Sequence, residues 1–198
     1  MAYPVDFIVP IGDGQRSRLL AGVGLVAVKA ILLLPHLIAL LLFAIMIHVI
    51  VWVGFWAIAF TGRIPVWVYE FSEAFISWAG RTTAWFTGTT DVYPTFGTNE
   101  EHPAQVDISL ETAHRSRVLA ILGIVLVRPL LALPHLFVLL WLTLGTLAVT
   151  WFGYVMVLIN GELPIGVHRY LVQFQRWYVR VWAWIAALTD DYPPFSLS

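Results

Sequence analysis

The sequence predicts an all-α integral membrane protein built from two tandem repeats, each a transmembrane helical hairpin followed by an interfacial amphipathic helix. The chain is 60% hydrophobic and only 12% charged, whereas soluble domains are typically about 45–50% apolar and about 25% charged. It contains two apolar runs, each long enough for two passes through a bilayer. It also repeats a set of charged, aromatic and proline residues at a constant spacing of 99 positions.

A duplication without insertions divides the chain into two units, residues 1–99 and 100–198. Chance similarity between apolar runs does not explain matched charged and proline residues outside those runs. The matched segments are Arg16-Ser17-Arg18 with Arg115-Ser116-Arg117, Pro35-His36 with Pro134-His135, Trp78 and Arg81 with Trp177 and Arg180, and Asp91-Val92-Tyr93-Pro94-Thr95-Phe96 with Asp190-Asp191-Tyr192-Pro193-Pro194-Phe195. We call the last pair of segments the closing motifs.

The two apolar runs extend over residues 19–60 and 118–159. Proline disfavours helical conformation in the residue before it and suits the first turn of a helix. We therefore expect Pro35 and Pro134 to mark the turn of a hairpin in each unit. In the first unit the arms would be residues 19–34, a short arm, and residues 37–60, a full-length arm.

A glycine and a proline follow each apolar run, a pattern typical of a helix end and the start of another helix. The segments after them, 66–86 and 165–185, place large aromatic residues on one helical face and charged residues on the other. Such amphipathic helices suit the membrane interface. The alternative is that these helices pack on a core within the protein.

Charge predicts the orientation of the chain. In the hairpin topology every Lys and Arg except Lys29 and Arg128 lies on the same side as both termini and the linker. Because basic residues concentrate on the cytoplasmic side, we expect a multi-pass protein of the inner (plasma) membrane with cytoplasmic termini. Lys29 and Arg128 are intramembrane cations in this scheme. We expect them to extend toward the outer headgroups; the alternative is a pair of buried cations.

Each half resembles a bacterial membrane domain of unknown function, number 4389. The resemblance rests on Tyr3-Pro4, the basic residues of the Arg-Ser-Arg segment, Pro-His-Leu in the apolar run, the glycine and proline that end it, and the closing motif. The second half departs from the pattern at its start, where His102-Pro103 replaces Tyr3-Pro4. The resemblance implies this membrane architecture and no activity.

Histidine is the first candidate for chemistry, because His36 and His135 occupy equivalent positions beside the turn prolines. Paired histidines on helices can ligate haem iron, so haem or a pigment is a possible ligand. The alternative is that each imidazole satisfies local backbone groups. We predict no cofactor and no metal, and we expect bound lipids.

The acids of the closing motifs, Asp91 and Asp190, suit either a cation site or a turn that accepts backbone N–H bonds. We expect each motif to fold back so that its aspartate pairs with an arginine at the membrane interface. The candidate arginines are Arg81, Arg180, Arg16, Arg18, Arg115 and Arg117, and Tyr93, Pro94, Tyr192 and Pro193 would lie at the same interface.

Composition and motifs exclude several classes of function. A net charge of −1 without a basic run argues against nucleic-acid binding, and the lack of cysteine rules out thiolate chemistry. No hydrolase, phosphate-binding or dinucleotide-binding motif occurs. We therefore expect a non-catalytic accessory or scaffold subunit, bound to other membrane subunits or to itself. The alternatives are a haem- or pigment-binding subunit, a channel or transporter component, and a membrane-shaping hairpin protein.

Overall fold

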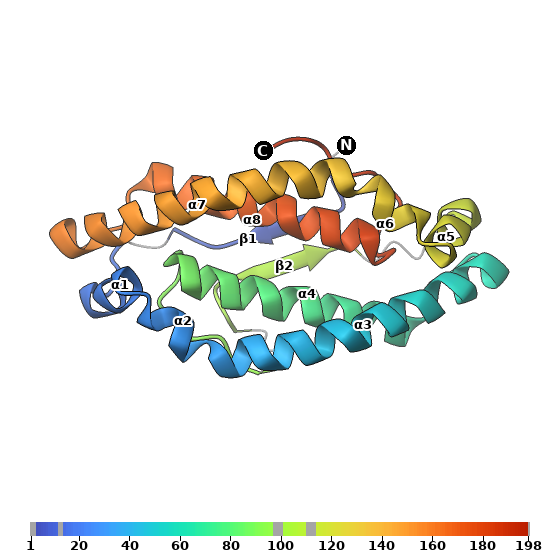
Figure 1. Ribbon diagram of the computed structural model, residues 1–198, viewed down its shortest axis with the longest axis horizontal. Helices are drawn as coiled ribbons and strands as arrows, with labels where there is room; N and C mark the ends of the chain where they lie inside the picture. The colour runs from blue at the N-terminus through green and yellow to red at the C-terminus, as the bar shows by residue number, and fades with distance from the viewer. Residues whose placement is uncertain (1–2, 12–13, 97–100, 110–113, 198) are drawn as a thin grey trace.

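The computed structural model describes residues 3–11, 14–96, 101–109 and 114–197, and most of them are helical (Figure 1). The first unit contains strand β1 (Val5–Ile8) and helices α1 (Arg18–Leu25), α2 (Val28–Leu32), α3 (Leu34–Thr61) and α4 (Val66–Thr87). The second unit repeats the order with β2 (Gln105–Ile108), α5 (Arg117–Ile124), α6 (Val127–Leu131), α7 (Leu133–Asn160) and α8 (Ile165–Ile185).

Capping residues set the ends of these helices in the same way in both units. The hydroxyl of Ser17 accepts a hydrogen bond from the backbone of Leu20 at the start of α1, as favoured N-cap residues do. Gly62 ends α3 at φ 74° and Gly161 ends α7 at φ 81°, in the left-handed region that glycine enters without a steric penalty. The predicted stop of each long apolar helix is therefore confirmed.

The predicted hairpin between the two arms of each apolar run is wrong. Instead of one arm, residues 18–32 form two short helices, α1 and α2, which meet at Ala27 with φ 60°. Pro35 lies in the first turn of α3, and α2 leads into α3 across a single residue, Leu33. The real chain reversal follows α3, because α4 runs back along it (Figure 1).

The amphipathic helices α4 and α8 lie in the middle of the molecule, packed against each other and under the long helices (Figure 1). The expectation that they rest on the membrane interface is wrong, because their aromatic faces are covered by protein. Trp85 and Trp184 are each only 2% exposed. Their polar faces meet the β ribbon, where Tyr69 donates to Ile108 O at 2.9 Å and Arg180 Nε donates to Val5 O at 3.1 Å.

The two units interlock about an approximate twofold axis. β1 and β2 pair antiparallel, and the pair Phe7 and Val106 consists of equivalent residues of the two units. The axis therefore passes through this pair. The first helix of each unit also packs on the long helix of the other unit: α1 packs on α7, and α5 packs on α3. The repeats thus form one body with shared cores.

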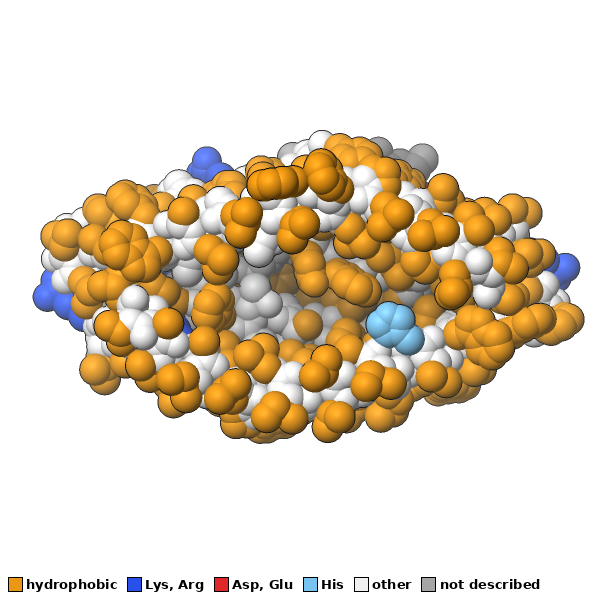
Figure 2. Space-filling view, viewed as in Figure 1, with side chains coloured by type: hydrophobic (Ala, Val, Ile, Leu, Met, Phe, Trp, Pro, Cys, Tyr) orange, Lys and Arg blue, Asp and Glu red, His pale blue; other side chains and the backbone are white. Residues whose placement is uncertain are grey.

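The long helices α3 and α7 are apolar and poorly covered. Each has 28 residues and is long and apolar enough to cross a membrane. Within the most apolar stretch, only 11% of α3 and 22% of α7 is buried inside the molecule. Figure 2 shows apolar side chains spread over this face, with basic side chains at the two ends of the molecule.

The interlock depends on close approach at two equivalent glycines, Gly24 and Gly123. A Cβ added to Gly123 would lie 2.6 Å from the ring of Phe55, and one added to Gly24 would lie 2.5 Å from the ring of Tyr154. We predict that Gly123→Ala lowers the free energy of unfolding by about 1–3 kcal/mol through overpacking. Thermal unfolding in detergent measures this loss.

The matched control is Gly166→Ala in α8, where an added Cβ meets nothing within 4 Å. Replacing a helical glycine there removes backbone entropy from the unfolded chain, so a gain of up to about 1 kcal/mol is expected. Equal effects of the two substitutions would contradict the close packing of α5 on α3.

Candidate functional site

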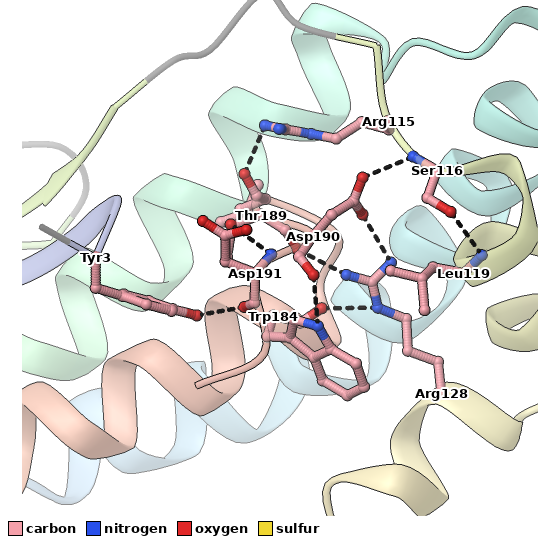
Figure 3. Close-up of polar contacts among 10 residues, drawn as sticks. Tyr3, Arg115, Ser116, Leu119, Arg128, Trp184, Thr189, Asp190 and Asp191 are labelled. Carbon is pink, nitrogen blue, oxygen red and sulfur yellow. Dashed lines mark hydrogen bonds and ion pairs between the residues drawn. The ribbon is translucent and has the colours of Figure 1, made fainter. Parts of the chain in front are cut away.

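Each closing motif folds back onto the start of its own unit. Asp190 Oδ2 accepts a hydrogen bond from the backbone N–H of Ser116 at 2.6 Å, and its other oxygen lies 3.5 Å from Arg128 Nη1 (Figure 3). In the first unit Asp91 Oδ2 accepts from the backbone N–H of Ser17, also at 2.6 Å. The aspartates thus cap the first helix of each unit, where the helix dipole favours negative charge.

The chain therefore returns to the Arg-Ser-Arg segment as expected, but the expected arginine partners are wrong. Asp190 pairs with Arg128, and no ion pair between Asp91 and an arginine occurs among the residues that the structure describes. The backbone N–H of a serine binds one carboxylate oxygen in both units, and the position equivalent to Arg128 in the first unit is a lysine, Lys29.

The cations Lys29 and Arg128 do not extend toward headgroups, in contrast to the expectation. They are 1% and 0% exposed and point into the protein. Lys29 Nζ donates to Trp85 O at 2.9 Å near the end of α4 and lies over the rings of Trp85 and Tyr154, at 4.7 and 4.9 Å from the ring centroids. The Tyr154 ring comes from the other unit, so this cation also joins the repeats.

Arg128 repeats this arrangement with more hydrogen bonds. Its Nε donates to Trp184 O at 2.9 Å, and its Nη2 donates to Thr189 O at 2.7 Å (Figure 3). Its guanidinium carbon lies 4.8 Å from the ring centroid of Trp184 and 5.8 Å from that of Phe55. Burial lowers the pKa of Arg128 to about 10, and Asp190 opposes the shift.

The tyrosine of each closing motif binds the end of a short helix. Tyr93 donates to Leu32 O at 2.7 Å, and Tyr192 donates to Leu131 O at 2.8 Å. Leu32 and Leu131 are the last residues of α2 and α6, where helical carbonyls lack intrahelical partners. The prolines that follow, Pro94 and Pro193, are buried.

The phenylalanine of each closing motif stacks on the histidine of the same unit. The ring centroids of His36 and Phe96 are 4.1 Å apart at an interplanar angle of 10°, and those of His135 and Phe195 are 3.7 Å apart at 11°. Both histidines are fully buried at the first turn of a long helix.

A tryptophan determines the tautomer of each histidine. Trp78 Nε1 donates to His36 Nδ1 at 3.0 Å, and Trp177 Nε1 donates to His135 Nδ1 at 3.1 Å. Since the indole only donates, the neutral imidazole carries its proton on Nε2. In this arrangement neither imidazole presents a lone pair to a haem iron. The residues that the structure describes also contain no group of three or more metal-ligating side chains.

The basic residues of the Arg-Ser-Arg segments divide into two kinds. Arg16 Nη2 donates to Thr89 O at 2.9 Å, and Arg115 Nη2 donates to Leu188 O at 2.6 Å, so both bind carbonyls just beyond α4 and α8. Arg18 and Arg117 are exposed. Arg81 and Arg180, expected on a polar surface, are only 4% and 8% exposed, and Arg180 donates to the ribbon at Val5 O.

The start of each unit contacts the closing motif of the other. Tyr3 donates to Asp191 O at 2.8 Å (Figure 3), and His102 Nε2 donates to Val92 O at 3.1 Å. Asp191 and Val92 are equivalent positions, so the replacement of Tyr3 by His102 preserves the same hydrogen bond. Sequence reasoning missed this pair and missed Tyr154, although the recurrence of Trp78 and Trp85 at positions 177 and 184 pointed to their partner roles.

The whole cluster is a structural clasp, which we define as both closing motifs with Lys29, Arg128, His36 and His135. It joins the two ends of each unit and joins the units to each other. Its buried polar groups contact backbone carbonyls, backbone N–H groups and aromatic rings. Such an arrangement holds helix ends together.

The clasp predicts that Asp190→Asn destabilises the protein. The substitution keeps the shape of the side chain but leaves the buried Arg128 without its counter-charge, and a hydrogen bond to a charged group contributes about 1.5–3 kcal/mol. Thermal unfolding in detergent measures the loss. Asp191→Asn, an exposed neighbour, is the control and should change little; an unchanged melting temperature for Asp190→Asn would contradict the clasp.

Lys29 gives the clasp a pH dependence. Burial lowers the pKa of Lys29 to about 8 from its ordinary 10.5, with Asp91 opposing the shift. Between these values the unfolded chain binds more protons, so the stability that depends on this group rises with pH. We predict that Lys29→Met abolishes this rise, measured as the unfolding midpoint at several pH values between 8 and 10.5. Identical pH profiles for both proteins would refute it.

Comparison with known proteins identifies a family. The family model described as Domain of unknown function (DUF4389) matches residues 25–97 and again residues 124–196. Both matches begin within the short helices and end at the closing motif, so each includes the long helix and the buried helix of its unit. No curated protein and no solved structure matches the chain. Because the matched segments cover well over half of its length, the chain belongs to the DUF4389 family as a tandem duplication of the domain.

Proposed function

We propose that this protein is a non-catalytic scaffold that lies in a single leaflet of a membrane, with α3 and α7 parallel to the membrane plane. The observation that carries the proposal is the apolar face made by these two helices, which the protein leaves largely uncovered (Figure 2). Exposed apolar patches of this size mark membrane or protein contact sites. Exposed residues such as Leu41, Trp141 and Trp151 suit lipid chains and their interface.

The β ribbon supports an in-plane position over a spanning one. Asp6 and Asp107 face each other in the register of the ribbon, which lies on the twofold axis midway along the molecule (Figure 1). If the long helices crossed the bilayer, these two aspartates, together with Arg176, which pairs with Asp6, would lie at mid-depth. A charged residue there costs about 2.5–3.5 kcal/mol on insertion scales. In the in-plane position the apolar face meets lipid while the ribbon meets water.

The same placement suits the cytoplasmic leaflet of the plasma membrane. Exposed Arg18, Arg63 and Arg117 belong to the ends of the helices, and basic side chains appear at both ends of the apolar face (Figure 2). Each basic residue near an anionic leaflet contributes about 1 kcal/mol of attraction. The termini and the ribbon would then face the cytoplasm, where other membrane subunits or a second copy of the chain can bind.

A labelling experiment separates the in-plane model from a spanning model. The chain has no cysteine, so single substitutions report one site each. Arg63 follows α3 and Glu162 follows α7, and these helices run in opposite directions (Figure 1). We predict that Arg63→Cys, Glu162→Cys and Asp107→Cys all react with an impermeant maleimide from the same side of sealed vesicles.

A spanning molecule would give the opposite pattern, with Arg63→Cys and Glu162→Cys labelled from different sides. The scaffold role has its own test. Purification from native membranes in mild detergent should recover a stoichiometric membrane partner or an oligomer, and a solitary monomer would contradict it.

A further inference from the structure

The β ribbon gives the molecule a second open surface. Helices α4 and α8 lie between the ribbon and the long helices (Figure 1). Phe7 of β1 is fully buried against the helices, and because successive side chains of a strand point to opposite sides, its neighbour Asp6 points outward. Asp6 pairs with Asp107 of β2, which is exposed. We call β1 and β2, with the charged residues of α4 and α8 beside them, the ribbon face.

The two halves of the ribbon face carry opposite charge. Strand β2 packs on α4 and β1 packs on α8, so each half consists of one strand and one helix. Three acids and one arginine give the first half a net charge of −2, and three arginines and one acid give the second half a net charge of +2 with histidine neutral. These residues are Glu70, Glu73, Arg81 and Asp107 in the acidic half, and Asp6, Arg169, Arg176 and Arg180 in the basic half.

The acids of the acidic half repel one another. Glu73 is half-buried, and its pKa is raised by burial and then by the charges of Asp107 and Glu70, so the three acids lie close together. Among the residues that the structure describes, no ion pair involves any of these three acids. Like charges that face each other on a sheet are destabilising, so a positive surface brought to this half would relieve the repulsion.

The basic half offers such a surface. Arg176 forms an ion pair with Asp6 and so lies against the ribbon. Arg169 lies two helical turns before Arg176, on the same side of α8, and is exposed. It pairs with no acid among the described residues. Its equivalent in the first unit is Glu70, which is also exposed. The duplication therefore places opposite charges at equivalent positions on either side of the approximate twofold axis.

We propose that the ribbon face forms a symmetric dimer with a second copy of the chain, in which the acidic half of each copy meets the basic half of the other. The approximate twofold axis runs through the ribbon and perpendicular to it. A dimer axis within the plane of the ribbon, at right angles to the line from Glu70 to Arg169, places each Glu70 opposite the Arg169 of the other copy. An axis along that line would place acid against acid, so charge selects the first arrangement.

Such a dimer has an apolar face on each of its two outer sides. If each apolar face lies in a leaflet, as the proposed function holds, the dimer joins two bilayers through their aqueous surfaces. This consequence rests on the proposed function, whereas the contact itself rests on the charges of the ribbon face. Exposed ion pairs are individually weak and are screened by salt. Many copies on one membrane would act together and strengthen the attachment.

The first test measures self-association of the full chain in detergent by analytical ultracentrifugation. The Debye length falls from about 30 Å in 0.01 M salt to about 3 Å in 1 M salt. We expect a monomer–dimer equilibrium whose dissociation constant rises at least about tenfold over this range. A monomer at low salt would overturn the proposal. So would a dimer that is insensitive to salt, as one formed by the apolar faces would be.

Two charge reversals give a sharper test. Arg169→Glu leaves an acid at both contact positions, and Glu70→Arg leaves an arginine at both. Each variant alone should self-associate at least about tenfold more weakly, because attraction becomes repulsion at two symmetric contacts. An equimolar mixture of the two variants should dimerise again, since one copy is then acidic where the other is basic. Arg63→Glu makes the same charge change at an exposed residue outside the ribbon face and should have no effect.

Failure of the mixture to associate, or equal weakening by Arg63→Glu, would overturn the dimer. The second test dilutes the protein from detergent onto preformed vesicles of phosphatidylcholine and phosphatidylglycerol. Light scattering should show clustering of the vesicles at low salt, no clustering with Arg169→Glu alone, and clustering again with both variants together. Dimers in detergent that fail to cluster vesicles would overturn the position in the leaflet and leave the contact standing, so the two failures are distinguishable.

Discussion

A buried cation binds the C-terminal end of each central helix and contacts an aromatic ring of the other unit. Lys29 and Arg128 lie inside apolar runs, yet each binds a carbonyl in the last turn of α4 or α8. There the helix dipole and the unpaired carbonyls favour positive charge. An aromatic ring from the opposite unit covers each cation. One side chain thus ends a helix, positions the closing motif and joins the repeats.

This arrangement also explains the unusual surface. Trp85 and Trp184, which an amphipathic helix on the membrane surface would turn toward lipid, are instead buried and cover the two cations. Helices α3 and α7 form the outer layer and are covered on one side only. The protein therefore has a polar side formed around the ribbon and an apolar side formed by the two longest helices, a distribution that suits one leaflet of a bilayer.

Much of the local structure could be predicted from the sequence. The duplication, the long helices, their glycine ends and the helical segments 66–86 and 165–185 follow from period and capping chemistry. The break between α1 and α2 could not be predicted, because it places Ala27 and Leu126 in a left-handed conformation that neither residue type signals. Because the sequence does not reveal that break, its pattern predicts a hairpin turn at Pro35.

The clasp was predictable only in outline. Recurrence of Asp91 and Asp190 next to the turn-forming Tyr-Pro indicated that each closing motif folds back toward a basic segment, and each returns to the Arg-Ser-Arg segment of its own unit. The hydrogen-bond partner of each aspartate could not be inferred, because it is a backbone N–H group, which every residue except proline carries. The packing of α1 on the second unit and of α5 on the first could not be predicted either, because an apolar helix can pack on either repeat with similar chemistry. The equivalence of Tyr3 and His102 emerges only when their acceptors are seen.

We propose that the clasp built around the buried cations leaves α3 and α7 to lie flat in one leaflet. Polarised infrared spectroscopy of the protein in aligned bilayers tests it most directly, because the amide I dichroism reports the mean tilt of helices. The long helices and the central helices run along the same axis of the molecule (Figure 1), so their signals add. We expect a mean helix axis close to the membrane plane. A mean axis close to the membrane normal would contradict it.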